Sequence, residues 1–153
     1  MRCAPPGVNP AGASQIVVIS QLTLRHEHRQ AMVDHVRSLW PEEACGLLAG
    51  LDGQVQRVYC IENIRHSRYD YFMDPNQQVR AMLDIEAAGW EVCSIFHSHP
   101  AGQPLPSATD VDRAYYPDAV YIILAPASGS DWVMRGFAIR EGQVREVQLN
   151  SVP

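Results

Sequence analysis

The chain has 153 residues, 46% of them hydrophobic, and a formal net charge of −5 at pH 7. A chain of this length buries one ordinary hydrophobic core, which indicates a single domain. The acidic balance argues against broad binding to a nucleic-acid phosphate backbone, because such binding needs a basic surface. No apolar run approaches the length of a membrane span.

The N-terminal segment has the composition of a tail. Residues 1–15 contain Pro5, Pro6 and Pro10 among small residues, and they lack the apolar core of a signal peptide. We therefore expect a disordered tail over residues 1–15 and one domain over residues 16–153. The four cysteines form no Cys-x-x-Cys pair, which together with the missing signal peptide favours reduced thiols and a cytoplasmic location.

Extended and helical patterns alternate in the first part of the domain. Residues 16–20 form a short apolar run that predicts a strand. Over residues 24–40 the apolar side chains, Met32 and Val36 among them, follow helical spacing. Pro41 ends this predicted helix, because proline cannot continue the hydrogen-bond pattern.

A hairpin and a second helix are predicted next. Residues 44–51 and 55–64 have the composition of strands, and Gly53 supplies the turn between them. Asp74 precedes a proline, which is typical of a helix N-cap followed by the first helical position. This helix ends before Gly89, a plausible C-terminal cap.

The second half of the domain continues the alternation and then becomes a meander. The sequence predicts a strand over residues 90–96 and a short helix over residues 107–115. Three further strands are predicted over residues 120–124, 132–139 and 144–149. The last two strands flank Glu141-Gly142 and form a hairpin. We therefore expect the α/β class, with a mixed central sheet flanked by helices.

Two histidines after the 90–96 strand carry the main chemical signal. His97 and His99 lie two positions apart in a His-Ser-His-Pro segment, so that in an extended chain both imidazoles point to one face. Asp110 follows a short loop and is the natural carboxylate partner. Two imidazoles and one carboxylate leave a fourth tetrahedral position open, which is typical of catalytic rather than structural zinc.

Asp110 also has a structural interpretation. The segment from Ser107 to Asp110 follows a proline and has the pattern of a helix start, with Ser107 as N-cap. A histidine pair with one residue between is a weak signal by itself, whereas the pair followed by Ser-x-x-Asp is a strong one. The two interpretations are compatible, because a helix that starts beside the strand end would hold Asp110 against the same metal.

These residues resemble the metal motif of the JAMM metalloproteases, the MPN-domain isopeptidases, and in particular their compact bacterial and archaeal members. The run from Pro41 to Gly50 is similar to the glutamate segment of that family, and Tyr71-Phe72-Met73-Asp74-Pro75 is similar to another of its segments. The resemblance covers nearly the whole chain after residue 15. It implies a three-layer α-β-α fold shared with the cytidine deaminases.

The resemblance also implies roles for individual residues. By position, His97, His99 and Asp110 would bind one Zn²⁺ per chain, and Glu43 would be the general base. Ser107 would donate a hydrogen bond to the oxyanion. Glu42 is a local rival of Glu43, although the spacing of the family favours Glu43.

The activity implied is zinc-dependent hydrolysis of the amide bond after the C-terminal glycine of a ubiquitin-like or sulfur-carrier protein. The expected partner is such a protein with a Gly-Gly tail. A zinc-retaining module that binds a ubiquitin-like partner without turnover is one alternative, and a nucleic-acid-associated JAMM relative is another, against which the acidic balance weighs. A deaminase is disfavoured, because the Pro-Cys-x-x-Cys ligand motif is absent.

Several further polar residues are interpreted as structural. His26 and His28 lie at the polar start of the first helix and are expected to be solvated. We expect His35 to be packed or hydrogen-bonded, and His66 to lie on the solvated surface. Cys45 is expected in the core, since no cationic neighbour that would activate its thiol is apparent.

Overall fold

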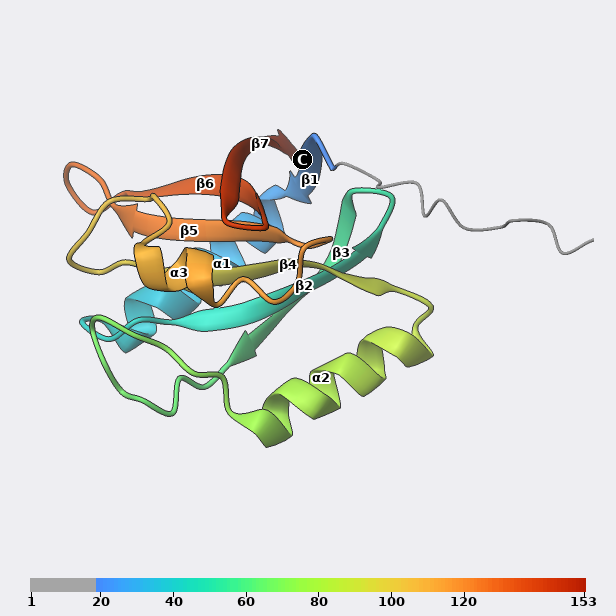
Figure 1. Ribbon diagram of the computed structural model, residues 1–153, viewed down its shortest axis with the longest axis horizontal. Coiled ribbons are helices and arrows are strands. Elements are labelled where there is room, and N and C mark those ends of the chain that lie inside the picture. The colour runs from blue at the N-terminus through green and yellow to red at the C-terminus, as the bar shows by residue number, and fades with distance from the viewer. Residues whose placement is uncertain (1–18) are drawn as a thin grey trace, which may run out of the picture.

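The computed structural model describes residues 19–153, which form one sheet with three helices around it (Figure 1). The predicted tail and most of the predicted 16–20 strand lie outside these residues. No helix in this described part is long and apolar enough to cross a membrane. The elements in chain order are β1 (Gln21–Arg25), α1 (His26–Leu39), β2 (Cys45–Leu51), β3 (Gln54–Ile61), α2 (Pro75–Ala87), β4 (Glu91–Ser98), α3 (Ala108–Asp112), β5 (Val120–Pro126), β6 (Trp132–Arg140) and β7 (Gln143–Val152).

The sheet is mixed and closes on itself in the order β1-β3-β2-β4-β5-β6-β7. β4 runs parallel to β5 and antiparallel to β2, and β1 runs parallel to β7 over five residue pairs. Only the pair Thr23–Gln54 joins β1 to β3 and completes the ring. The α/β class and the mixed sheet are confirmed. The predicted three-layer α-β-α arrangement is not clearly present, because the sheet closes into a barrel.

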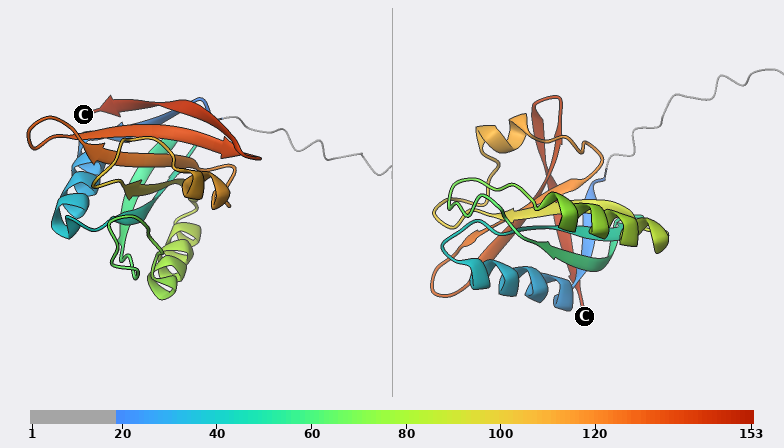
Figure 2. Two further views of the ribbon diagram at one scale, coloured as in Figure 1. Left: turned by 60° about the vertical axis from the view of Figure 1, so that its left-hand side comes forward. Right: turned by 90° about the horizontal axis from the view of Figure 1, so that it is seen from below.

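The strands β2, β4 and β5 are buried on both faces along most of their length. The helices α1 and α2 lie on opposite sides of this part of the sheet (Figure 2). Met32 and Val36 of α1 pack with alternate residues of the strands, namely Leu22, Leu24, Leu48, Phe96, Ile122 and Leu124. Ala81 and Ile85 of α2 pack with the intervening residues, namely Leu47, Ile95, Tyr121 and Ile123. The period of two along each strand therefore supplies two separate cores.

Two tight turns set the register of the antiparallel hairpins. Asp52 and Gly53 have positive φ angles of 51° and 73° between β2 and β3. Glu141 and Gly142 have φ angles of 48° and 76° between β6 and β7. Two consecutive left-handed residues give the twist that hairpin strands need, and glycine adopts this conformation without steric cost. The turns predicted at Gly53 and at Glu141-Gly142 are confirmed.

The start of the domain differs from its prediction. The first strand of the described residues, Gln21–Arg25, was not predicted, and α1 begins at His26 rather than at residue 24. Leu22 and Leu24 are fully buried and alternate with more exposed neighbours, which is a strand pattern. It was overlooked because residue 24 was assigned to the predicted helix over residues 24–40. The prediction that His28 is solvated is wrong, because it is 5% exposed and its Nδ1 accepts a hydrogen bond from the backbone N–H of Arg25.

Several other boundaries differ from their predictions. β3 ends at Ile61 rather than at residue 64. In the loop that follows, hydrogen bonds between the Asn63 side chain and the backbone replace regular pairing with a neighbouring strand. α3 ends at Asp112 rather than at residue 115. β4 continues to Ser98, so His97 lies inside the strand. The predicted α2 is confirmed, since the Asp74 side chain accepts a hydrogen bond from the Gln77 N–H.

Candidate metal centre and active site

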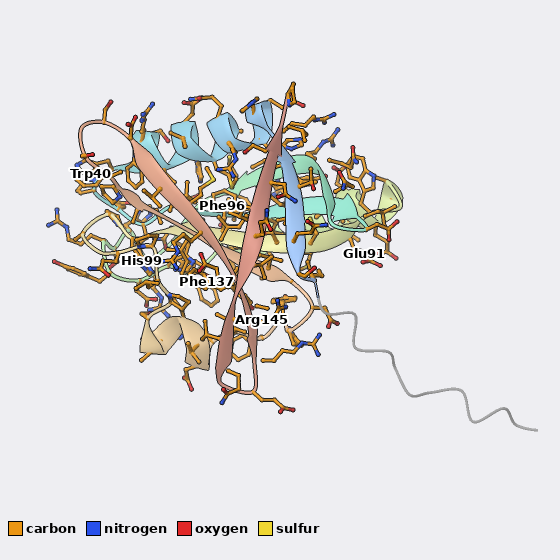
Figure 3. The ribbon with its side chains drawn as sticks, turned by 90° about the horizontal axis from the view of Figure 1, so that it is seen from above. Trp40, Glu91, Phe96, His99, Phe137 and Arg145 are labelled. Carbon is orange, nitrogen blue, oxygen red and sulfur yellow. The ribbon has the colours of Figure 1, made fainter. Side chains whose placement is uncertain are left out.

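His97, His99 and Asp110 converge at one end of β4. The Nε2 atoms of the two histidines are 2.9 Å apart. One carboxylate oxygen of Asp110 lies 3.2 Å from Nε2 of His97, and the other lies 3.1 Å from Nε2 of His99. Figure 3 shows His99 at the end of the sheet away from Glu91, where β4 begins. Three electron-pair donors that approach each other this closely, with two imidazoles among them, fit a divalent cation such as zinc.

The start of α3 explains how Asp110 reaches the histidines. The backbone N–H of Ser107 donates to Oδ2 of Asp110 at 2.9 Å, and the N–H of Asp110 donates to Oγ of Ser107 at 3.1 Å. This reciprocal arrangement is a capping box, which satisfies two N–H groups at the helix start. Both interpretations of Asp110 are therefore compatible in the structure: it caps α3 and it faces the two imidazoles.

The rings of the two histidines are held by different neighbours. Nδ1 of His99 lies 2.8 Å from the carbonyl oxygen of Gln103, which favours a proton on Nδ1 and leaves the Nε2 lone pair free for a metal. His97 is 1% exposed and stacks against Tyr71, with ring centroids 4.7 Å apart. Its Nδ1 has no hydrogen-bond partner among residues 19–153, so on the Nδ1 side packing rather than a hydrogen bond holds this ring.

The charge states of His97 and Asp110 suit metal binding. Burial lowers the pKa of His97, which keeps that imidazole neutral. Burial alone would raise the pKa of Asp110, but hydrogen bonds with His97 and His99 outweigh it and hold that pKa well below its usual range. A neutral imidazole and an ionised carboxylate are the protonation states that a metal ligand needs.

Glu43 lies beside this cluster, just before β2. Its side chain is 5% exposed, and it lines a hollow of about 190 Å³ together with His99, Ser107 and Asp110. Burial raises the pKa of Glu43 to about 7. Glu42 instead pairs with the exposed His66 at 3.2 Å. The structure therefore brings Glu43 and Ser107 to the three candidate ligands and leaves Glu42 outside the hollow.

A second, larger cavity of about 410 Å³ adjoins the cluster on the side of His97. Its walls come from the segment after β3, from α3 and from the sheet, and they include Tyr71, Tyr116, Tyr121, Leu47 and Ile95. The candidate site thus lies between a small hollow lined mostly by polar residues and a larger cavity with several aromatic residues, and the two share Asp70, Thr109 and Asp110 as walls.

Sequence reasoning missed three contributors to this site. Gln103 acts through its carbonyl group, which every residue possesses, so no side-chain pattern could reveal it. Tyr71 was noticed only as part of a family-like segment, and its stacking on His97 depends on the path of a long loop. Asn63 was placed inside a predicted strand, although asparagine is depleted in strands and is common where they end. The structural assignments of His35, His66 and Cys45 are confirmed, since His35 lies 3.1 Å from the Cys45 carbonyl oxygen, His66 is exposed and Cys45 is buried.

The fold and the site together define a JAB-type domain. Residues 25–135 match the model of the Prok-JAB family, described as prokaryotic homologs of the JAB domain. The chain belongs to this family, and the predicted resemblance to compact prokaryotic JAMM proteins is confirmed. With the relatives described next, the enzyme class is confirmed as well: a hydrolase of the JAMM peptidase type.

Named relatives match most of the chain. It is 35% identical over 133 residues to the CysO-cysteine peptidase of Mycobacterium tuberculosis, which covers 86% of this chain and 91% of that protein. It is 36% identical over 115 residues to the desampylase of Haloferax volcanii, with 70% and 82% covered. A solved structure of a protein from Desulfitobacterium hafniense matches with a TM-score of 0.78 and 36% identity, and it covers 86% of this chain and 93% of that one.

Proposed function

We propose that this chain is a zinc-dependent peptidase or isopeptidase that hydrolyses the amide bond after the C-terminal glycine of a ubiquitin-like or sulfur-carrier protein. The observation that carries the proposal is the convergence of His97, His99 and Asp110 beside the buried carboxyl group of Glu43. The names of the relatives support the substrate class, since one is a CysO-cysteine peptidase and another a desampylase.

His97, His99 and Asp110 would hold one zinc ion, with a fourth position open to solvent or substrate. Zinc bound there would lower the pKa of a water molecule to about 7 and polarise the scissile carbonyl. The protein contributes a neutral His97, an ionised Asp110 and the Gln103 carbonyl that fixes the His99 tautomer. These features favour coordination before any substrate arrives.

Glu43 would act as the general base and then as the general acid. Its carboxylate takes a proton from the attacking water and returns that proton to the leaving amine. A pKa of about 7 suits both steps, because the group exchanges protons readily near neutral pH. Glu43 is buried in the small hollow beside His99, and this position supports the assignment over Glu42.

Ser107 would stabilise the negative charge that develops on the carbonyl oxygen. Its Oγ accepts a hydrogen bond from the Asp110 N–H, which leaves its own O–H available as a donor. Ser107 is exposed to the hollow that Glu43 lines. A preorganised donor at this place is worth several kcal/mol in the transition state of amide hydrolysis.

A glycine tail suits the small hollow beside the candidate metal ligands. The hollow lined by Glu43, His99 and Gly102 has a volume of about 190 Å³, which admits a chain end of one or two glycine residues beside the candidate ligands. Cys45, Cys60 and Cys93, the cysteines in the described residues, are free thiols, in keeping with the reducing cytoplasmic location that we expect.

A cleavage assay with zinc-loaded protein tests the proposal. The substrates are ubiquitin-like proteins that end in Gly-Gly and carry one added cysteine or a short peptide, and mass spectrometry detects loss of the extension. We expect cleavage after the last glycine, and loss of cleavage when that glycine is replaced by leucine. Binding of the substrate without turnover would favour the non-catalytic module, and equal cleavage of the leucine variant would favour a general peptidase.

A further inference from the structure

Asn63 is a buried polar residue that the proposed mechanism does not use. Its side chain is 2% exposed and makes four hydrogen bonds, all to backbone groups. Nδ2 donates to the carbonyl oxygens of Glu43, at 2.9 Å, and Asp70, at 3.1 Å. Oδ1 accepts from the N–H groups of Arg65, at 3.1 Å, and Phe72, at 3.0 Å. The amide therefore uses two donors and two acceptor positions, which is its full capacity.

These bonds join Glu43 to the 63–73 loop, the segment between β3 and α2. Besides the bond from Asn63 to its carbonyl group, Glu43 donates its N–H to the Ser67 carbonyl oxygen at 2.8 Å. Both backbone polar groups of Glu43 are thus bound to this loop rather than to a neighbouring strand. The position of the Glu43 side chain depends on where the loop lies.

The same loop reaches the candidate metal ligands. Tyr71, two residues before the end of the loop, stacks against His97. Asn63 and Met73 form an isolated bridge that closes the loop at its base. One buried side chain therefore holds together a loop that contacts a candidate ligand on one side and the candidate base on the other.

We propose that Asn63 is a positioning residue, which sets the distance between the Glu43 carboxyl group and the metal ligands through the 63–73 loop. The proposal rests on the function proposed above, because it takes Glu43 as the base. A catalytic group that is displaced by about 1 Å loses on the order of a hundredfold in rate. The Asn63 amide prevents such a displacement from two sides, through the Glu43 carbonyl and through the loop backbone.

Kinetics of the Asn63→Asp variant test this role. Aspartate keeps the size and the acceptor oxygen that Arg65 and Phe72 use, and it removes the two N–H donors. We expect kcat to fall by about 10- to 100-fold, with KM changed less than about twofold and one zinc still bound per chain. Asn63→Ser, which keeps a single small donor, allows the same comparison if the aspartate variant does not fold. Unchanged kcat in a folded variant would overturn the proposal.

A double-mutant comparison separates positioning from general stabilisation. If Asn63 acts through Glu43, adding Asn63→Asp to the Glu43→Gln variant should cost almost no further activity. An equal fractional loss in both backgrounds would refute the positioning role and leave the proposed function intact. Full activity of Glu43→Gln alone would instead refute the assignment of the base. Ile85→Ala, a core change in α2 that lowers the denaturant midpoint, is the matched control and should keep kcat unchanged.

Discussion

Tyr71 stacks on His97 with the two ring planes 25° apart. The Nδ1 atom of His97 has no hydrogen-bond partner among residues 19–153, so stacking on the tyrosine ring takes the place of a hydrogen bond from this nitrogen. In many metal sites a hydrogen bond to the second ring nitrogen has this function. Here one of the two histidines is held by such a bond, from His99 to the Gln103 carbonyl, and the other by aromatic packing.

The Tyr71→Ala variant should bind zinc about tenfold more weakly, because supporting groups around a ligand are typically worth 10- to 100-fold in affinity. Tyr71→Phe keeps the ring and should bind zinc almost as well as the parent protein. Competition with a chromogenic chelator measures both dissociation constants. Equal affinity of the parent and the alanine variant would show that stacking does not position His97.

The His97→Ala/His99→Ala double variant should lose zinc. The parent protein, stripped with a chelator and reconstituted, should contain one zinc per chain by elemental analysis, because three ligands converge at a single place. A double variant that retains one zinc per chain would show that the metal lies elsewhere.

Glu43→Gln should lower turnover by a factor of about 10²–10⁴, the usual contribution of general acid–base catalysis. Zinc content and fold should stay nearly unchanged, because Glu43 is not among the three converging ligands. Glu42→Gln is the matched control, since Glu42 pairs with His66 at the surface and should keep its turnover. The opposite ranking of the two variants would make Glu42 the base.

The pH dependence of stability offers a check on Glu43 that needs no substrate. Its pKa is raised from 4.5 to about 7 in the folded protein, so between these values the folded state binds more protons than the unfolded state. In metal-free protein, this group should therefore make the free energy of unfolding fall as pH rises from about 4.5 to 7, by at most about 1.4 kcal/mol per pH unit. Denaturant titrations of the parent and Glu43→Gln proteins should diverge in this window, and parallel curves would contradict the burial effect.

Ser107→Ala should affect both catalysis and stability. Loss of an oxyanion donor costs about 2.7–4 kcal/mol in the transition state, and loss of an N-cap costs about 0.5–2 kcal/mol of stability. Turnover and denaturant midpoint measured on the same variant separate the two effects. Lower stability with unchanged turnover would leave Ser107 as a helix cap alone, which is the role that its hydrogen bond to Asp110 already shows.

The parts of the site that sequence predicted are those with local signals. His97 and His99 lie two positions apart next to a strand, and Asp110 lies in a helix-capping pattern, so short-range geometry was enough to group them. The fold elements with strong periodicity, such as α2 after Asp74, were also placed within one or two residues.

The remaining features depend on contacts between distant segments. Asn63 bonds to Glu43 across 20 positions, and a strand pattern in the sequence concealed this role. The closing pair Thr23–Gln54 depends on the accumulated twist of the whole sheet, which no single segment encodes. His28 is buried because β1 precedes α1 directly, and no strand was predicted over residues 21–25.

The single pair that joins β1 to β3 makes the closed sheet unequal around its circumference. β1 has five paired residues with β7 and one with β3, so the ring has a seam where few interactions must break. Local unfolding follows the path of fewest lost contacts, and it should detach β1 together with β7 at this seam. Cys45, at the end of β2 away from this seam, pairs with His97. The interactions around the candidate metal centre would therefore survive that opening. In hydrogen exchange, β1 should exchange early and the centre of β4 late, so that among the described residues the end of the sheet with the candidate site should stay folded longest.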